Sequence, residues 1–199
     1  MNIRNREVIS IEKGQLALVE QLLYVSCPVV ETLDSMKYPH LSSVRDNIAY
    51  IRKCVVGEQK KEIIADKRYF VVRRKNDRLI NESELEKIFQ ENGFEVVCME
   101  GLSFEEEVNV FSTAKCLVST LGGAMTNMIY CTPGAKVVCI YPTECISPVE
   151  FYQNIANSIG VKFFLCNAEI HNEKGSYDTI KYSLDISQCR KLIDALLER

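Results

Sequence analysis

Histidine is scarce in this chain of 199 residues. It has only two histidines, His40 and His171, and they lie far apart in polar segments. No two cysteines have the Cys-x-x-Cys spacing that zinc sites commonly use. The sequence therefore predicts no metal site.

A disulfide framework is not indicated either, although the chain has nine cysteines. Cys98, Cys116, Cys139 and Cys166 each lie within or beside an apolar run typical of a β-strand, where a free cysteine behaves as a small hydrophobe. An odd total of nine cysteines, mostly of this core type, suits a reducing compartment. We therefore expect a cytoplasmic protein, and we leave open a peripheral position at the membrane.

The chain also lacks a surplus of positive charge and a long apolar run. Its formal net charge of −3 gives no reason to expect nucleic acid or an anionic membrane as a partner. No apolar run approaches the roughly 20 residues of a transmembrane helix, and the polar start over residues 1–7 does not resemble a signal peptide. The composition, 47% hydrophobic and 26% charged, is that of a globular protein with room for one domain and an appendage.

From residue 67 onward, short apolar runs alternate with segments of helical periodicity. This alternation is typical of βαβ units and a parallel sheet. We therefore predict a doubly wound, Rossmann-like α/β domain over residues 67–199, with ligands bound at the carboxyl ends of its strands near a topological switch point. The predicted strands are 69–72, 94–98, 116–118, 136–141 and 161–166, the predicted helices are 81–93, 103–114, 126–129, 147–160 and 186–197, and 167–183 is a predicted loop.

Two of these helices begin with the pattern of a capping box. In this pattern a polar side chain accepts a hydrogen bond from the third helical N–H, and a glutamate there bonds back to the cap. Asn81 with Glu84 and Ser103 with Glu106 have the required spacing. We expect both pairs to cap their helices.

Residues 1–66 are less regular than the rest of the chain. Residues 8–11 and 16–25 are typical of short strands. The region is predicted to be an N-terminal extension that packs on the α/β domain, or the remnant of a larger N-terminal part. An apolar stripe predicts a helix that ends near Gly57, and its members are Leu41, Val44, Ile48, Ile51 and Val55.

A glycine-rich corner follows the predicted strand 116–118. Gly122, Gly123 and Ala124 lead directly into a helix-compatible segment, which brings main-chain N–H groups to a helix N-terminus. The helix dipole favours an anion there, and the absence of a Cβ atom lets a ligand approach closely. Thr126 and Asn127 add a hydroxyl and an amide. The corner therefore predicts a phosphate site, and a tight packing turn is the alternative.

Three motifs between Tyr69 and Pro142 resemble the C-terminal half of glycosyltransferase family 61. The first is a strand followed by arginine and then Arg-x-x-Asn-Glu, here Arg73 and residues 78–82. The second is Gly-Phe-x-Val followed by Leu-Ser-Phe, here 93–96 and 102–104. The third is a glycine-rich turn that ends in Thr-Asn and precedes Pro-Gly-Ala, here 122–127 and 133–135. Their order and spacing make the resemblance fairly specific.

The resemblance implies a GT-B architecture of two α/β domains. Members transfer a sugar with inversion, usually from a UDP-sugar, to a glycan acceptor, and capsular-polysaccharide enzymes are among them. GT-B enzymes need no bound metal, so no cofactor is expected, and arginines with helix N–H groups would compensate the diphosphate. The residues expected to bind the donor are Arg73, Arg78, Asn81, Gly122, Gly123, Ala124, Thr126 and Asn127.

The chain also departs from the family pattern. Leu121 occupies the position of the usual histidine, Cys139 that of a strand glutamate, and Glu107 that of a glutamine. Leucine can neither donate a hydrogen bond nor act as an acid or base. No catalytic residue is therefore assigned, although Glu144 or Glu150 could contact ribose hydroxyls, with capping and surface charge as the alternative.

Three functions follow from these observations. The first is an inverting glycosyltransferase, or its donor-binding half, completed by a missing N-terminal domain or a partner chain. The second is a non-catalytic nucleotide-binding or assembly module with the same fold. A dinucleotide-dependent oxidoreductase is weaker, because no Gly-x-Gly-x-x-Gly follows the first strand.

Overall fold

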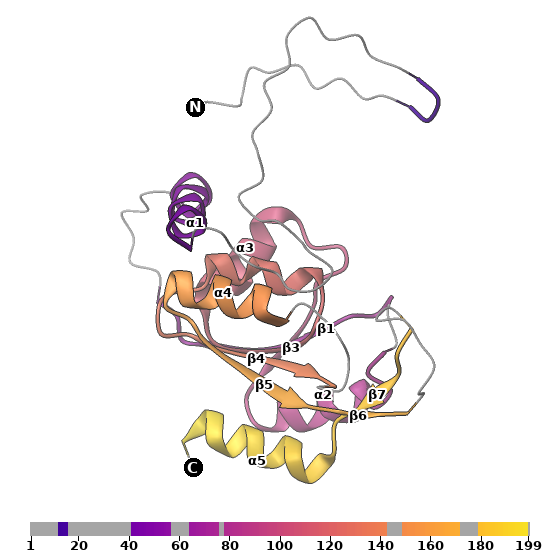
Figure 1. The fold of residues 1–199 in the computed structure, drawn as a ribbon. Helices are drawn as coiled ribbons and strands as arrows, with labels where there is room; N and C mark the ends of the chain where they lie inside the picture. The colour runs from indigo at the N-terminus through magenta and orange to yellow at the C-terminus, as the bar shows by residue number, and fades with distance from the viewer. Residues whose placement is uncertain are drawn as a thin grey trace, which may run out of the picture.

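The computed structural model describes residues 12–15, 41–56, 64–75, 78–142, 149–171 and 179–198 (Figure 1). The strands predicted at 8–11 and 16–25 lie outside the described residues. So do Ser147, Pro148 and Glu144.

A parallel sheet of five strands forms the centre of the molecule, which confirms the predicted α/β class. The spatial order is β2-β1-β3-β4-β5. The chain runs from β1 outward to the edge strand β2 and then crosses back to β3 on the other side of β1. The switch point therefore lies between β1 and β3, as in flavodoxin-like sheets. The strands are β1 (Lys67–Val72), β2 (Glu95–Cys98), β3 (Ala114–Thr120), β4 (Lys136–Tyr141) and β5 (Lys162–Asn167).

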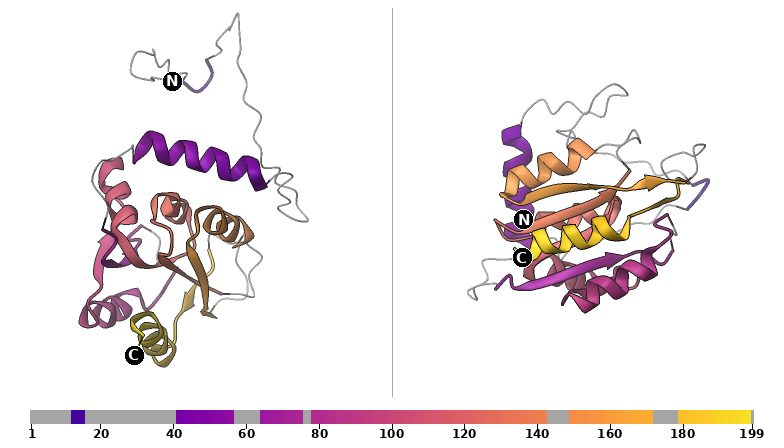
Figure 2. Two further views of the ribbon diagram at one scale, coloured as in Figure 1. Left: turned by 90° about the vertical axis from the view of Figure 1, so that its left-hand side faces the viewer. Right: turned by 90° about the horizontal axis from the view of Figure 1, so that it is seen from below.

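Helices cover both faces of this sheet (Figures 1 and 2). On one face, α2 (Glu82–Glu91) and α5 (Ile186–Leu197) pack against β-strand residues such as Phe70 and Val138. On the other, α3 (Phe104–Thr113), η2 (Gly123–Tyr130) and α4 (Val149–Ile159) pack against Val71, Leu117 and Val137. The alternation of buried side chains along each strand thus separates two apolar cores.

Helix α1 (Leu41–Val55) lies outside the layer of α3, η2 and α4 (Figure 2). It packs on α4 and η2. The predicted stripe is correct at Ile48, which is buried in the core, and wrong at Ile51, which is 41% exposed. Ile51 is exposed because the inner face of α1 runs through Ile48, the half-buried Arg52 and Val55.

The two predicted capping boxes have different outcomes. Ser103 forms the complete box, since its Oγ accepts from the N–H of Glu106 and the Glu106 carboxylate accepts from the N–H of Ser103. The Asn81 box is wrong, because its side chain caps nothing. Its Nδ2 instead donates to the carbonyl of Leu184 at 2.9 Å, and its Oδ1 accepts from the N–H of Leu184.

Two further segments differ from the prediction. Part of the loop predicted at 167–183 is an antiparallel pair, β6 (Glu169–Ile170) with β7 (Tyr182–Ser183). The segment after the glycine corner is helical as expected, but it is a 3₁₀ helix of eight residues, η2, instead of an α-helix.

Candidate functional site

A cavity of about 340 Å³ opens at the switch point of the sheet. The carboxyl ends of three neighbouring strands lead into it: Arg73 follows β1, Met99 and Glu100 follow β2, and Gly123 lies beyond β3. Helix η2 adds Ala124 and Asn127, and α3 adds Glu107. The volume falls at the lower end of the range for small-molecule sites. The cavity thus lies where open α/β sheets bind their ligands.

At Gly122 the absence of a side chain makes room for an arginine. A Cβ atom at this position would lie 2.0 Å from Nη1 of Arg73 and 3.6 Å from Nη2 of Arg78. The φ angle of 164° is extended backbone that any residue can adopt, so the constraint is space and not conformation. At Gly123, by contrast, a Cβ atom would meet nothing within 4 Å. Gly123 therefore leaves the main chain open to a ligand.

The three arginines near the corner have different environments. Arg74 pairs with Glu86 on α2, its Nη2 donating at 2.9 Å, and its Nη1 reaches Glu82 at 3.5 Å. Arg78 is buried, and its Nη2 donates to the carbonyl of Leu121 at 2.6 Å. Within the described ranges, no carboxylate forms an ion pair with Arg73. Arg73 thus presents a guanidinium to the cavity, whereas Arg78 supports the turn from beneath.

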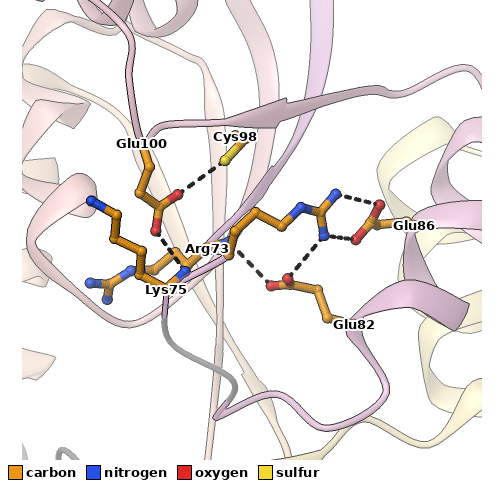
Figure 3. Close-up of polar contacts among 7 residues, drawn as sticks. Arg73, Lys75, Glu82, Glu86, Cys98 and Glu100 are labelled. Atoms are coloured by element: carbon orange, nitrogen blue, oxygen red, sulfur yellow. Dashed lines mark hydrogen bonds and ion pairs between the residues drawn. The ribbon is translucent and has the colours of Figure 1, made fainter.

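Figure 3 shows the Arg73 and Lys75 side chains extending away from Glu82 and Glu86. Only the main-chain N–H of Arg73 reaches back toward α2, where it donates to Glu82 at 3.4 Å. The cationic ends of Arg73 and Lys75 consequently lie on one side of the segment that follows β1. Of these two residues, Arg73 lines the cavity.

The start of η2 is fixed by several hydrogen bonds. The carbonyl of Gly122 accepts from the N–H of Met125 at 2.9 Å and from the hydroxyl of Tyr152 at 3.1 Å. The 3₁₀ pattern itself offers no acceptor for the N–H groups of Gly123 and Ala124. Thr126 donates its hydroxyl back to the Gly123 carbonyl at 2.6 Å. The helix therefore begins with two N–H groups that have no acceptor in the 3₁₀ pattern, on two residues that line the cavity.

Two carboxylates complete the cavity wall. Glu107 accepts from Nδ2 of Asn127 at 2.7 Å, which joins α3 to η2. Glu100 accepts from the Cys98 thiol at 3.1 Å and from the N–H of Lys75 at 3.4 Å. Burial raises the pKa of Glu100, but these hydrogen bonds outweigh it and lower the pKa overall. Glu100 therefore carries a negative charge near neutral pH.

Glu82, which accepts from the N–H of Arg73, has an unusual pKa. Its burial raises the pKa to about 7, against the N–H of Arg73 and the charge of Arg74, which lower it. Glu86 and Glu100 add negative charge nearby and raise it further. Glu82 belongs to the first family motif, but the sequence predicted neither its raised pKa nor the place of Glu100 in the cavity. The one usable signal for Glu100 was that it lies two residues beyond the end of a strand.

A larger hollow of about 660 Å³ lies between β2 and α3. Its charged lining residues are Glu95, Glu105 and Glu106, and no lysine or arginine lines it. An anionic ligand would meet only negative charge there. We therefore place the candidate site at the smaller cavity.

Comparison with known protein families identifies the chain. The model of the family described as Glycosyltransferase 61 matches residues 10–138, which is more than half of the chain and includes β1, β2, β3 and η2. The chain belongs to glycosyltransferase family 61. This match also begins well before Tyr69, where the three motifs start. No curated protein matches the chain.

Membership in glycosyltransferase family 61 implies a sugar donor and an acceptor as substrates. No helix among the described residues has the length and apolarity to cross a membrane. In the same residues, no group of three His, Cys, Asp or Glu side chains could hold a metal ion.

Two of the three departures from the family pattern, Leu121 and Cys139, lie in the core, whereas the third, Glu107, lines the cavity. Leu121 is 1% exposed, and Cys139 is fully buried. Burial raises the pKa of the Cys139 thiol, although the charge of Arg78 opposes the rise. Neither side chain can exchange a proton with a ligand at neutral pH. A glycosyltransferase 61 reaction in this chain would need its base from elsewhere.

Six of the eight predicted donor residues meet at the switch point: the two arginines, both glycines, Ala124 and Asn127. Thr126 lies on the same helix, with its hydroxyl bonded locally. Both polar atoms of the Asn81 side chain are bonded to the main chain of Leu184. Glu150 is exposed on α4. Donor binding by any of these residues stays a prediction.

Proposed function

We propose that this member of glycosyltransferase family 61 transfers a sugar with inversion from a nucleotide-sugar, with UDP as the first candidate nucleotide. The observation that carries the proposal is the guanidinium of Arg73. It lines the cavity without a carboxylate partner in the described chain and lies against Gly122 at the start of η2. A diphosphate would provide the charge that this guanidinium lacks.

In the proposed reaction, a hydroxyl of the acceptor attacks the anomeric carbon of the donor sugar. The new carbon–oxygen bond forms as the bond to the diphosphate breaks on the opposite side. Negative charge then develops on the leaving diphosphate. The guanidinium of Arg73 can grip phosphate oxygens in a bidentate manner, and the N–H groups of Gly123 and Ala124 point at the same charge. No residue is assigned as the base that removes the hydroxyl proton.

Several finer features belong to the same proposal. It uses no metal or other cofactor, because arginine and helix N–H groups compensate the charge. Acceptor contacts and the base would come from a second domain or a partner chain, as a GT-B architecture implies. Surface or capsular polysaccharide is the proposed product. The buried thiols of the described strands suit a cytoplasmic location.

A non-catalytic module that binds the nucleotide is the second candidate. It is favoured by Leu121 and Cys139, whose side chains lie in the apolar core and leave the cavity without the groups expected there. Such a module would retain Arg73 and the N–H groups of η2. It would differ from the enzyme only in failing to transfer the sugar.

Calorimetric titration with UDP, GDP and their sugar conjugates tests the binding step. We expect one nucleotide to bind, and Arg73→Ala to weaken it about 10-fold or more, because a charge-assisted hydrogen bond contributes roughly 1.5–3 kcal/mol. Arg190→Ala is the charge-matched control, since Arg190 is exposed on α5 across the sheet. If neither nucleotide releases or absorbs heat, the donor site is wrong.

A second assay separates the enzyme from the module. Release of sugar from the bound conjugate, with and without added saccharide acceptors, is followed by chromatography. Transfer that Arg73→Ala abolishes supports the enzyme. Tight binding without any transfer supports the module.

A further inference from the structure

One arginine far from the cavity forms hydrogen bonds with the opposite end of η2. Arg52 on α1 donates through Nη1 to the carbonyl of Ile129 and, at 2.6 Å, to the carbonyl of Cys131. These carbonyls lie at the C-terminal end of the 3₁₀ helix whose first residues line the cavity. Seven residues at about 2.0 Å each put the two ends roughly 14 Å apart. Arg52 therefore cannot touch a ligand at Gly123.

The environment of Arg52 is unusual for a cation. The residue is half-buried, and burial lowers its pKa. No carboxylate in the described part of the chain pairs with it. Burial raises the pKa of the Cys131 thiol to about 12, so this neighbour is neutral at physiological pH. The charge of Arg52 is thus compensated chiefly by the carbonyl dipoles at the helix end.

Helix η2 needs support of this kind. A 3₁₀ helix has poorer hydrogen-bond geometry than an α-helix, and runs longer than three or four residues are uncommon, whereas η2 has eight. Its start is held by Tyr152, and its second turn is held by the bond between Asn127 and Glu107. Its last turn is held by Arg52. Loss of the restraint at either end would loosen the first residues of η2, which line the cavity.

We infer that Arg52 is a positioning residue for the donor site, acting through η2 and without contact to the substrate. The inference rests on the proposed function, because it takes the start of η2 to bind the diphosphate. A cation at the C-terminal end and an anion at the N-terminal end stabilise the same dipole and the same ordered helix. Each therefore strengthens the other, and by linkage the docking of α1 and the binding of donor are coupled.

Three variants of the full chain test this coupling. Arg52→Ala removes both hydrogen bonds. Arg52→Lys keeps the charge and a nitrogen with several N–H donors, but on a side chain of different length and shape from the one that places Nη1 between the two carbonyls. Arg45→Ala, at an exposed position of the same helix, is the charge-matched control. Hydrogen exchange is measured at the amides of residues 125–130, with those of α2 as the internal reference, and UDP and GDP affinities are measured by calorimetry.

We expect faster exchange in η2 and unchanged exchange in α2 for Arg52→Ala, together with a loss of nucleotide affinity of about fivefold or more. Arg52→Lys should lose less on both measures, and Arg45→Ala should lose nothing. A general loss of structure would instead accelerate exchange in α2 as well. If Arg52→Ala does not fold, Arg52→Lys and Arg52→Gln carry the same comparison.

The outcomes separate this inference from the proposed function. Normal exchange in η2 and normal affinity for Arg52→Ala would overturn the positioning role. Faster exchange in η2 with unchanged affinity would show that Arg52 orders a helix that does not bind the donor, which also overturns it. Failure of the unmodified protein to bind UDP or GDP would overturn the proposed function and, with it, the inference, whatever the exchange rates are.

Discussion

At the scale of single residues, the corner after β3 is built by arginines and not by turn conformation. Gly122 has an extended backbone, and its hydrogen in place of a methyl group admits the guanidinium of Arg73. Arg78 holds the same corner through the carbonyl of Leu121. The missing side chain at Gly122 therefore makes room for an arginine of the protein itself. The open main chain that a ligand could approach is at Gly123.

Gly122→Ala should therefore impair binding more than stability. The added methyl group clashes with Nη1 of Arg73, but this atom ends a flexible side chain that can move aside. We expect the free energy of unfolding, measured in urea, to change by less than about 1 kcal/mol, because no left-handed backbone is involved. Nucleotide affinity should fall, because the displaced guanidinium no longer faces the cavity.

The double variant with Arg73→Ala decides whether this explanation holds. If Gly122→Ala acts through Arg73, it should cause no further loss of affinity once the guanidinium is gone. Additive losses in calorimetry would mean that the methyl group obstructs the ligand directly.

At the scale of elements, α3 carries Glu107 to the cavity, and its capping box fixes where the helix begins. Ser103 and Glu106 exchange hydrogen bonds of 2.7 and 3.3 Å across the first turn. Ser103→Ala removes the side-chain acceptor, so it should lower the free energy of unfolding by about 1 kcal/mol. This is measured by urea unfolding followed by circular dichroism. Ser158→Ala, near the end of α4, is the matched control and should lie within about 0.5 kcal/mol of the parent. Equal losses would show that the box contributes nothing specific.

The same pattern at Asn81 shows why sequence predicts some caps and not others. Both motifs have the correct spacing, yet Asn81 bonds Leu184, which is 103 positions away. Local sequence records which cap is available but not whether a distant main-chain group competes for it. The strands were easier to predict, because a buried parallel strand reads as a continuous apolar run whatever its neighbours are.

For the candidate site, the sequence predicted the location but not which residue makes which contact. Arg73, Gly123 and Asn127 could be predicted, because each lies near the end of a strand or at a helix start. The burial of Arg78, the position of Glu100 and the contact of Arg52 could not. Each depends on which strands and helices become neighbours across the switch point, and no local pattern encodes that arrangement.

At the scale of the whole molecule, the charge around Glu82 links the site to the stability of the fold. This carboxyl lies at the start of α2, beside the N–H of Arg73 and Arg74, with Glu86 and Glu100 as negative neighbours. Its side chain is 14% exposed, and its pKa of about 7 lies above the ordinary value of 4.5. The folded state consequently holds a proton that the unfolded chain releases at lower pH.

The sign of the resulting pH dependence follows from linkage. Stability from a raised carboxyl pKa is fully present below pH 4.5 and is lost as pH rises through about 7. Over this interval Glu82 should remove on the order of 2–3 kcal/mol of unfolding free energy. Glu82→Gln cannot ionise, so its unfolding free energy, measured in urea by circular dichroism between pH 5 and 8, should rise relative to the parent as pH increases. A difference between the two proteins that stays constant over this range would mean that Glu82 is already ionised at pH 5 and that Arg73 and Arg74 outweigh its burial.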